Sequence, residues 1–158
     1  MRVGIGYDVH PFAPGRPLML GGIRFDTDYG LAGHSDGDCL THAVIDAVLG
    51  AAGLGDIGIH FPPGEEHYRD ADSIGLLREV IGKLHAAQSV VVNVDATVVT
   101  ERPRINAKAP EIRARLAAAL GVEESRVSIK ATTMDGLGAL GRGEGLAAVA
   151  IALIDERP

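Results

Sequence analysis

The sequence has no tryptophan, one cysteine, three tyrosines and three phenylalanines among 158 residues. Basic residues are also few, since 15 Lys and Arg stand against 21 Asp and Glu, which gives a formal net charge of −6. A protein that binds nucleic acid over an extended surface needs a basic stripe and stacking aromatic side chains, and both are missing. We therefore expect no nucleic-acid partner. A single small phosphate ligand is still compatible with this charge, because a metal ion or a helix N-terminus can reverse the local field.

The lone cysteine, Cys39, excludes an internal disulfide and a zinc site built from several cysteines, and it fits a reducing cytoplasm. Long apolar runs are absent as well, because the longest, Leu146 to Ile154, is too short to cross a bilayer. The chain starts with strand-like sequence rather than with the pattern of a signal peptide. We expect a cytoplasmic protein without membrane contact.

The hydrophobic content of 46% is sufficient for one buried core, and the chain shows neither a linker nor an internal repeat. Residue patterns predict strands at 3–9, 18–25, 89–100, 127–132 and 146–154, and helices at about 35–53, 73–87 and 110–121. Segments 55–67 and 134–145, rich in glycine, are predicted to be loops. This order favours one α+β domain over residues 1–158, with a mixed β-sheet packed against helices in two layers.

The first predicted helix is opened by Ser35-Asp36-Gly37-Asp38, and Ser35 or Asp36 is expected to cap it. An apolar stripe predicts that this helix buries one face, through Leu40, Ala43, Val44, Ala47, Val48 and Ala51. In the last strand, alanines alternate with larger apolar residues. The alanine-lined face therefore invites close approach by another layer or subunit.

Asp8 and His10 are separated by one residue, so on a strand both side chains project from the same face. His42 lies about 200° around the helix from Leu40, and so away from the apolar stripe. Together Asp8, His10 and His42 would form a two-histidine, one-carboxylate set, which suits Zn²⁺ and leaves a fourth position open. Other divalent metals can use the same ligands. Taken singly, the residues are equally compatible with a polar strand edge and a solvated helix face.

Two acidic residues flank His42 on the helix, Asp38 at i−4 and Asp46 at i+4. Either could accept a hydrogen bond from the second ring nitrogen and so fix the tautomer of the histidine. Cys39 is an unsuitable nucleophile, because the neighbouring Asp38 is expected to raise the pKa of its thiol.

Two segments could hold a phosphate. Residues 34–37 precede the first helix, so backbone amides and the positive end of its dipole would face a bound anion. Residues 132–135 lead into a glycine-rich loop that contains Arg142. Plain helix capping and a long hairpin loop are the structural alternatives. No Walker, dinucleotide-binding or G-x-S-x-G motif is present, which excludes ATPase, Rossmann and serine-hydrolase functions.

Six segments stand together in a specific order and spacing, namely Gly4–His10, His34–Asp38 with His42, Gly55–Gly58, Ala71–Ser73, Lys130–Thr133 and Gly141–Gly145. On these segments the chain resembles the 2-C-methyl-D-erythritol 2,4-cyclodiphosphate synthase family over essentially its whole length. The resemblance implies a lyase that converts a CDP-linked sugar-alcohol phosphate, 4-diphosphocytidyl-2-C-methyl-D-erythritol 2-phosphate, into the cyclic diphosphate. CMP would be released, in the non-mevalonate pathway of isoprenoid biosynthesis.

The resemblance also implies a role for individual residues. Asp8, His10 and His42 would hold zinc, and His34 and Thr133 would stabilise the transition state. Further substrate contacts would come from Ser35, Asp56, Ile57, Gly58, Phe61, Thr100, Arg104, Ile105, Asn106, Thr132 and Arg142. It implies a homotrimer with active sites between neighbouring subunits. A second ion, Mg²⁺ or Mn²⁺, would sit on the substrate diphosphate, with Asp135 as its candidate protein ligand.

Three residues depart from the family pattern. Asp135 stands where a glutamate is expected, Ala139 where a phenylalanine lines the central trimer cavity, and Pro63 where an aspartate often contacts substrate. Two other functions are compatible with the residues alone. A zinc-dependent phosphohydrolase would activate water at the same three ligands, and a non-catalytic nucleotide-binding oligomer would use the glycine-rich loop.

Overall fold

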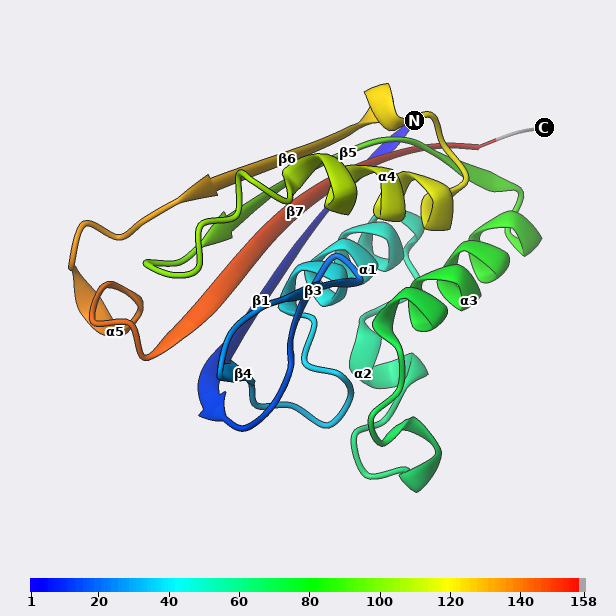
Figure 1. Cartoon of the computed structure of the whole chain (residues 1–158). Coiled ribbons are helices and arrows are strands. Elements are labelled where there is room, and N and C mark those ends of the chain that lie inside the picture. The colour runs from blue at the N-terminus through cyan, green and yellow to red at the C-terminus, as the bar shows by residue number, and fades with distance from the viewer. Residues whose placement is uncertain (157–158) are drawn as a thin grey trace.

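A five-stranded mixed sheet forms one layer of the computed structural model, which describes residues 1–156 (Figure 1). Its strands follow the order β4-β1-β7-β5-β6. Their bounds are β1 Arg2–Pro14, β4 Tyr29–Leu31, β5 Ser89–Val99, β6 Val127–Thr132 and β7 Gly145–Glu156. Strands β5 and β6 are parallel, and the other neighbours are antiparallel. The last two residues of the predicted domain, 157–158, lie outside the described residues.

The second layer consists of helices that cover one face of this sheet (Figure 1). They are α1 (Cys39–Ala52), α3 (Ser73–Ala86) and α4 (Ala109–Leu120). Helix α1 packs on β1 and β7 and contacts α3 on its other side. The predicted α+β class, with a mixed sheet against helices, is confirmed. Within residues 1–156, no helix is long and apolar enough to cross a membrane.

Several predicted boundaries were wrong. The predicted strand 18–25 is a hairpin of β2 (Leu18–Leu20) and β3 (Ile23–Phe25), because Gly21 and Gly22 turn the chain with positive φ angles of 59° and 71°. Loop 55–67 contains α2 (Ile57–His60) and a 3₁₀ turn, and loop 134–145 contains α5 (Gly138–Gly141). A second 3₁₀ turn, Glu124–Arg126, precedes β6.

The first helix starts later than predicted. Its N-cap is Asp38, whose side chain accepts a hydrogen bond from the Thr41 amide, so Ser35 and Asp36 do not cap it. The Asp38 carboxylate therefore binds the Thr41 amide at this helix end. The predicted contact of residues 34–37 with a phosphate stays a prediction.

Helix α1 is buried on nearly every side, not only along the predicted apolar stripe. The sheet lies so close that a Cβ atom at Gly4 would be 2.1 Å from the Ala47 carbonyl oxygen, and one at Gly6 would be 1.9 Å from that of Ala43. The alanines of β7 at 148, 150 and 152 face the same helix and are fully buried. The close approach predicted from the alanine-lined face is confirmed, and the approaching layer is α1.

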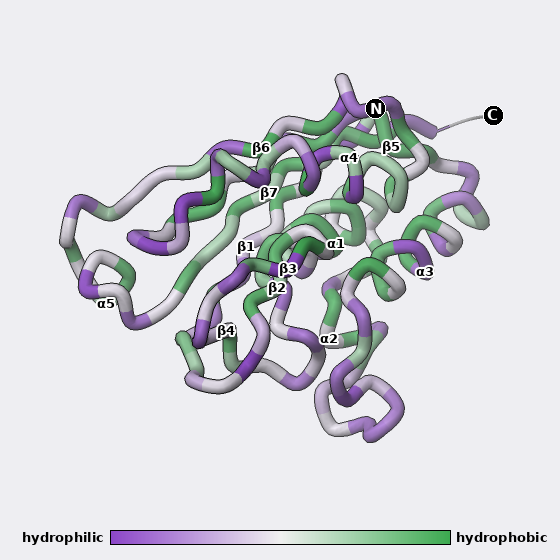
Figure 2. The backbone as a smooth tube through the Cα atoms, viewed as in Figure 1, coloured by the Kyte–Doolittle hydropathy of each residue, from purple (hydrophilic) through white to green (hydrophobic). Residues whose placement is uncertain are grey.

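The opposite face of the sheet carries exposed apolar side chains. Because Gly4 and Gly6 face α1, the alternating residues Val3, Ile5, Tyr7 and Val9 point the other way, and they are 48% to 68% exposed. Ile151 of β7 belongs to the same face and is 45% exposed. Figure 2 shows the hydrophobic colour running along β7 and through α1, whereas the loop between α2 and α3 is mostly hydrophilic.

Candidate active site

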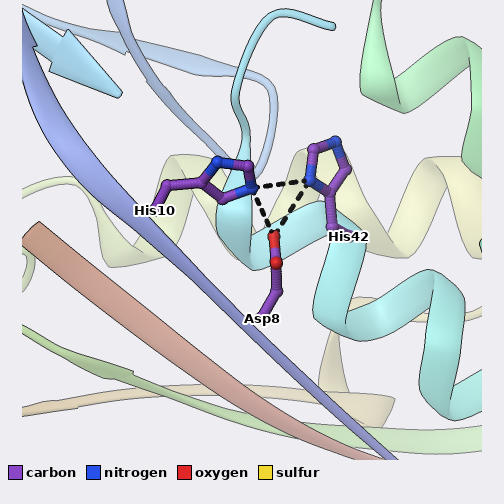
Figure 3. Close-up of side chains that lie close together, drawn as sticks. All are labelled: Asp8, His10 and His42. Carbon is purple, nitrogen blue, oxygen red and sulfur yellow. Dashed lines mark hydrogen bonds and ion pairs between the residues drawn. The ribbon is translucent and has the colours of Figure 1, made fainter. Parts of the chain in front are cut away.

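Strand β1 and helix α1 bring three metal-ligating side chains together. Asp8 and His10 continue the register of Gly4 and Gly6, so they project from the face of β1 that α1 covers. His42, near the start of α1, points at them, as Figure 3 shows. The Asp8 carboxylate oxygen Oδ2 lies 2.8 Å from His10 Nε2 and 3.0 Å from His42 Nδ1, and the two nitrogens are 3.4 Å apart.

The second nitrogen of each imidazole is already engaged by the protein. His10 Nδ1 donates to the Ala32 carbonyl, and His42 Nε2 lies 3.0 Å from Ser35 Oγ and 2.9 Å from Ser73 Oγ. Both rings therefore present their free nitrogen to Asp8. No fourth His, Cys, Asp or Glu within residues 1–156 joins the cluster. The three side chains can hold a divalent metal ion and leave coordination positions for a ligand.

Asp8 and His10 each stabilise the charged form of the other. Burial alone would raise the pKa of the Asp8 carboxyl, but the hydrogen bonds and positive charge of His10 and His42 outweigh it and hold that pKa well below its usual range. The hydrogen bond from Asp8 in turn raises the pKa of His10. His42 is 8% exposed, so the alternative of a solvated helix face is wrong.

Neither predicted carboxylate supports His42 by a hydrogen bond. Asp38 is fully buried, and its oxygens accept from the amides of Gly21 and Gly22 and from the amide and hydroxyl of Thr41. Asp46 accepts from the Ile57 amide at 2.8 Å and so holds the start of α2. Unpaired backbone amides at a turn and at a helix start compete for these carboxylates more effectively than an imidazole one turn away.

The residues that do support His42 were missed by the sequence analysis. Ser73 Oγ accepts from His42 Nε2 and donates to Asp36 Oδ1 at 2.5 Å, and the Ser73 amide donates to Asp36 Oδ2 at 3.0 Å. In the sequence, Asp36 and Ser73 are typical of helix starts, and 37 residues separate them. The only available signal was the recurrence of Ala71-Asp72-Ser73 in the family pattern.

A cavity of about 240 Å³ opens beside the three ligands. Its lining is Asp8, His10, His34, Ser35, His42, Ile57, Gly58, Phe61, Pro63, Tyr68 and Leu76. Of these, Tyr68 and Leu76 were not predicted. Asp56 does not line the cavity but caps α2 by accepting from the Ile59 amide. Five of the predicted substrate and transition-state residues therefore line the cavity beside the metal ligands, namely His34, Ser35, Ile57, Gly58 and Phe61.

The remaining predicted residues lie elsewhere on the chain. A second cavity, of about 600 Å³, is lined by Thr100, Glu101, Pro103, Arg104, Ile105, Asn106, Ala107, Ala131, Thr132 and Thr133. It shares no lining residue with the first cavity. Arg142 lines neither and forms an ion pair with Glu144 at 2.7 Å. Asp135 accepts from the Thr133 hydroxyl at 3.1 Å. One chain thus keeps His34 and Thr133 in separate cavities.

Cys39 is fully buried, and burial, followed by the charges of Asp8 and Asp38, raises the pKa of its thiol. The expected exclusion of this cysteine as a nucleophile is confirmed, with burial as the main cause.

Comparison with known proteins assigns the chain to a family. The model described as the YgbB family matches residues 1–155. The chain belongs to the YgbB family. Its relatives include the 2-C-methyl-D-erythritol 2,4-cyclodiphosphate synthase of Moorella thermoacetica, which is 54% identical over 99% of this chain and 96% of that protein.

Solved structures agree with this assignment. The bifunctional IspDF of Campylobacter jejuni superposes with a TM-score of 0.95 at 36% identity, over 99% of this chain and 42% of that chain. The IspF of Plasmodium falciparum, solved as a CDP complex, gives a TM-score of 0.87 at 29% identity, over 99% of this chain and 97% of that chain.

In this YgbB chain, Ser73→Ala is expected to lower metal affinity about 10- to 100-fold, because His42 Nε2 loses one of its two hydroxyl partners, the one that Asp36 holds in place. Competition with a chromophoric chelator measures this change. Asp46→Asn is the matched control, since Asp46 also lies close to His42 but bonds to α2. An equal loss of affinity in both variants would contradict the assignment of the supporting role to Ser73.

Metal binding is also expected to weaken as pH falls. A proton competes with the metal for His10 Nε2, and the hydrogen bond from Asp8 raises the pKa of His10 above its ordinary value of 6.5. The metal-binding form is thus present at higher pH and is lost as pH falls through this raised pKa, whereas Asp8 stays ionised. Chelator competition between about pH 8 and pH 5 measures the effect. An affinity that stays constant over this range would contradict it.

Proposed function

We propose that the chain is a 2-C-methyl-D-erythritol 2,4-cyclodiphosphate synthase. The observation that carries the proposal is the convergence of Asp8, His10 and His42 beside a cavity that also presents His34 and Ser35, in a member of the YgbB family. The substrate would be 4-diphosphocytidyl-2-C-methyl-D-erythritol 2-phosphate. The CDP complex of the Plasmodium falciparum relative supports a substrate that carries a cytidine diphosphate.

Zinc is the metal that the ligand set fits best. A tetrahedral ion with bonds of about 2.0–2.1 Å holds its ligand atoms about 3.3 Å apart. The separations of 2.8, 3.0 and 3.4 Å among the three ligand atoms are close to this value. Bound at these side chains, zinc would supply positive charge to the phosphate oxygens.

The reaction is an intramolecular phosphoryl transfer. An oxygen of the 2-phosphate forms a bond to the β phosphorus of the diphosphate, and the bond from that phosphorus to the bridging oxygen of CMP breaks. The nucleophile needs no general base, because the second pKa of a phosphate monoester is about 6 and the group is largely ionised at neutral pH. The task of the protein is to hold the two phosphates in line and to reduce their repulsion, and such orientation can contribute roughly 7 to 11 kcal/mol.

The chain's own residues divide this task. His34 and Ser35 line the first cavity together with the metal ligands, and their side chains would donate to phosphate oxygens. Ile57, Gly58 and Phe61 would pack against the carbon chain of the substrate and exclude water, which would otherwise compete with ring closure. Pro63, in place of an aspartate, offers only its carbonyl, so no side-chain hydrogen bond to substrate comes from this position.

The second cavity would bind the cytidine end of the substrate. Thr100 and Arg104 to Asn106 line it together with Thr132 and Thr133. Mg²⁺ or Mn²⁺ would supply further positive charge to the substrate diphosphate, and Asp135, which accepts from the Thr133 hydroxyl, would be its candidate protein ligand. Because His34 and Thr133 lie in separate cavities, one chain alone does not bring both to a single phosphate.

Assembly as a homotrimer would join the cavities of neighbouring subunits. The exposed apolar face of β1 and β7 offers the surface that such an assembly needs, since contiguous apolar patches mark protein contacts. Ile5→Arg, in the middle of this face, is expected to shift the protein to monomer and to abolish turnover. Light scattering after gel filtration measures the oligomer, with Ala86→Arg on α3 as the control. A fully active Ile5→Arg monomer would contradict the shared site.

Phosphorus NMR of the purified protein with the CDP-linked substrate tests the function directly. The expected products are CMP and the cyclic diphosphate. Inorganic phosphate or an uncyclised diphosphate would indicate a phosphohydrolase instead, and an unchanged spectrum would indicate a non-catalytic nucleotide-binding oligomer. We also propose a cytoplasmic location, supported by the single, unpaired Cys39.

A further inference from the structure

The segment from Ala32 to Ser35 contacts a metal ligand and also lines the first cavity. Its first carbonyl, at Ala32, accepts from His10 Nδ1, and its last two side chains, His34 and Ser35, line the cavity. Gly33 lies directly against the His10 ring, because a Cβ atom there would be 3.2 Å from His10 Cε1. A small displacement of this segment would therefore move His10 and two cavity-lining side chains at once.

The guanidinium group of Arg16 binds backbone carbonyls of this segment. Arg16 donates through Nη1 to the Gly33 carbonyl at 3.1 Å and through Nη2 to the Ser35 carbonyl at 2.8 Å. The two acceptors are the residues on either side of His34. The His34 carbonyl itself accepts from the Asp70 amide at 2.9 Å, and the Asp70 carboxylate lies 3.8 Å from Arg16 Nη2. Every carbonyl from Ala32 to Ser35 thus has a fixed partner.

The backbone that carries Arg16 is itself held tightly. It lies between β1 and β2, and the Gly15 amide donates to the Asp28 carbonyl at 3.2 Å. At Gly30, a Cβ atom would be 2.2 Å from the Pro17 carbonyl oxygen and 2.7 Å from that of Arg16. The Arg16 side chain is only 32% exposed, and the backbone that carries it is held by these contacts.

We propose that Arg16 is a positioning residue for the cyclisation, which fixes His34 and Ser35 in the geometry that the reacting phosphates need; this inference rests on the proposed function. Arg16 does not line the cavity and acts through the backbone of residues 33–35. The planar guanidinium donates in two directions at once, whereas a lysine ammonium is a single point of charge. The role therefore belongs to arginine and not to positive charge in general.

The test compares three variants. Arg16→Ala is expected to lower kcat about 10- to 100-fold, with a smaller effect on KM. This is the range found when a residue that supports active-site residues by hydrogen bonds is removed. Arg16→Lys is expected to resemble Arg16→Ala rather than the unchanged protein. Arg24→Ala is the matched control, because Arg24 lines the same surface hollow as Arg16 while its side chain is exposed. It should leave kcat unchanged.

Chemical rescue separates positioning from a general structural role. Millimolar guanidinium chloride, well below denaturing concentrations, is expected to restore part of the lost kcat of Arg16→Ala and to leave Arg24→Ala unaffected. A merely unstable variant would not be rescued. Arg16→Ala activity within twofold of the unchanged protein, full activity in Arg16→Lys, or the absence of rescue would each overturn the proposal.

Amide hydrogen exchange tests the same role without catalysis. Exchange at the amides of Asp36 and Asp70 is expected to accelerate in Arg16→Ala and not in Arg24→Ala, because Asp36 follows the segment that Arg16 holds and Asp70 donates to the His34 carbonyl within it. Unchanged exchange at both amides would overturn the proposal. If the unchanged protein forms no cyclic product, the proposed function fails independently of this readout.

Discussion

Replacing His42 with alanine is expected to remove the metal and turnover together while leaving the fold in place. His42 supplies one of three ligands, and Asp8 with His10 alone is a weak two-residue site on one strand. We expect metal affinity to fall by more than about 100-fold, which exceeds the usual effect of changing a residue that only hydrogen-bonds to a ligand. The loss of the imidazole also leaves Ser35 and Ser73 short of one partner, which costs about 1–3 kcal/mol of stability.

Elemental analysis after dialysis measures the metal, and CMP release measures turnover. His85→Ala is the control, because His85 is an exposed histidine at the end of α3. It should keep both metal and activity. A His42→Ala protein that is active without metal would remove the basis of the proposed mechanism, whereas circular dichroism that matches the unchanged protein shows that the fold survives.

The metal ligands could be predicted from the sequence because local periodicity decides where they point. The two-residue period of β1 places Asp8 and His10 on one face, and the helical period places His42 off the apolar stripe. That the two elements meet was not predicted from the sequence; in the structure, Gly4 and Gly6 on the same face of β1 leave room for the helix backbone. Periodicity therefore placed each ligand on its own element, and the packing of α1 on β1 brings the ligands together.

The groups that support the ligands could not be predicted in the same way. Asp38 and Asp46 have the right helical spacing from His42, but each carboxylate is claimed by backbone amides from a distant segment, at Gly21 and Gly22 or at Ile57. Ser73 reaches His42 only because α3 packs beside α1. Hydrogen-bond competition between segments depends on tertiary packing, and spacing along the chain does not report it.

The hairpin at residues 18–25 and the late start of the first helix share a cause. Asp38 binds the two amides of the Gly21-Gly22 turn and caps α1 with the same carboxylate. The buried Asp38 carboxylate thus holds the turn that interrupts the predicted strand, and it also fixes the start of α1. Burial of this carboxylate, followed by the charge of Asp36, raises its pKa, and hydrogen bonds from Thr41 and from the Gly22 amide oppose that rise.

The contact between β1 and α1 gives the second large prediction. Gly6→Ala is expected to destabilise the protein by about 3 kcal/mol or more, at the upper end of the cost of overpacking. The added methyl group would lie 1.9 Å from the Ala43 carbonyl oxygen and 2.7 Å from the Ala47 amide nitrogen. Both are backbone atoms inside α1, so no side chain can rotate away and the whole helix must shift.

That shift also moves the site, because His42 immediately precedes Ala43 on α1 while Asp8 lies two residues after Gly6 on β1. Gly6→Ala should therefore weaken metal binding in addition to lowering the midpoint of thermal unfolding by about 6 to 12 °C. Gly82→Ala, in the open interior of α3, has space for the methyl group and should keep or slightly raise stability. Urea unfolding and chelator competition on both variants measure the two effects. A Gly6→Ala protein as stable as Gly82→Ala would show that β1 and α1 are not held at the separation on which the three-ligand cluster depends.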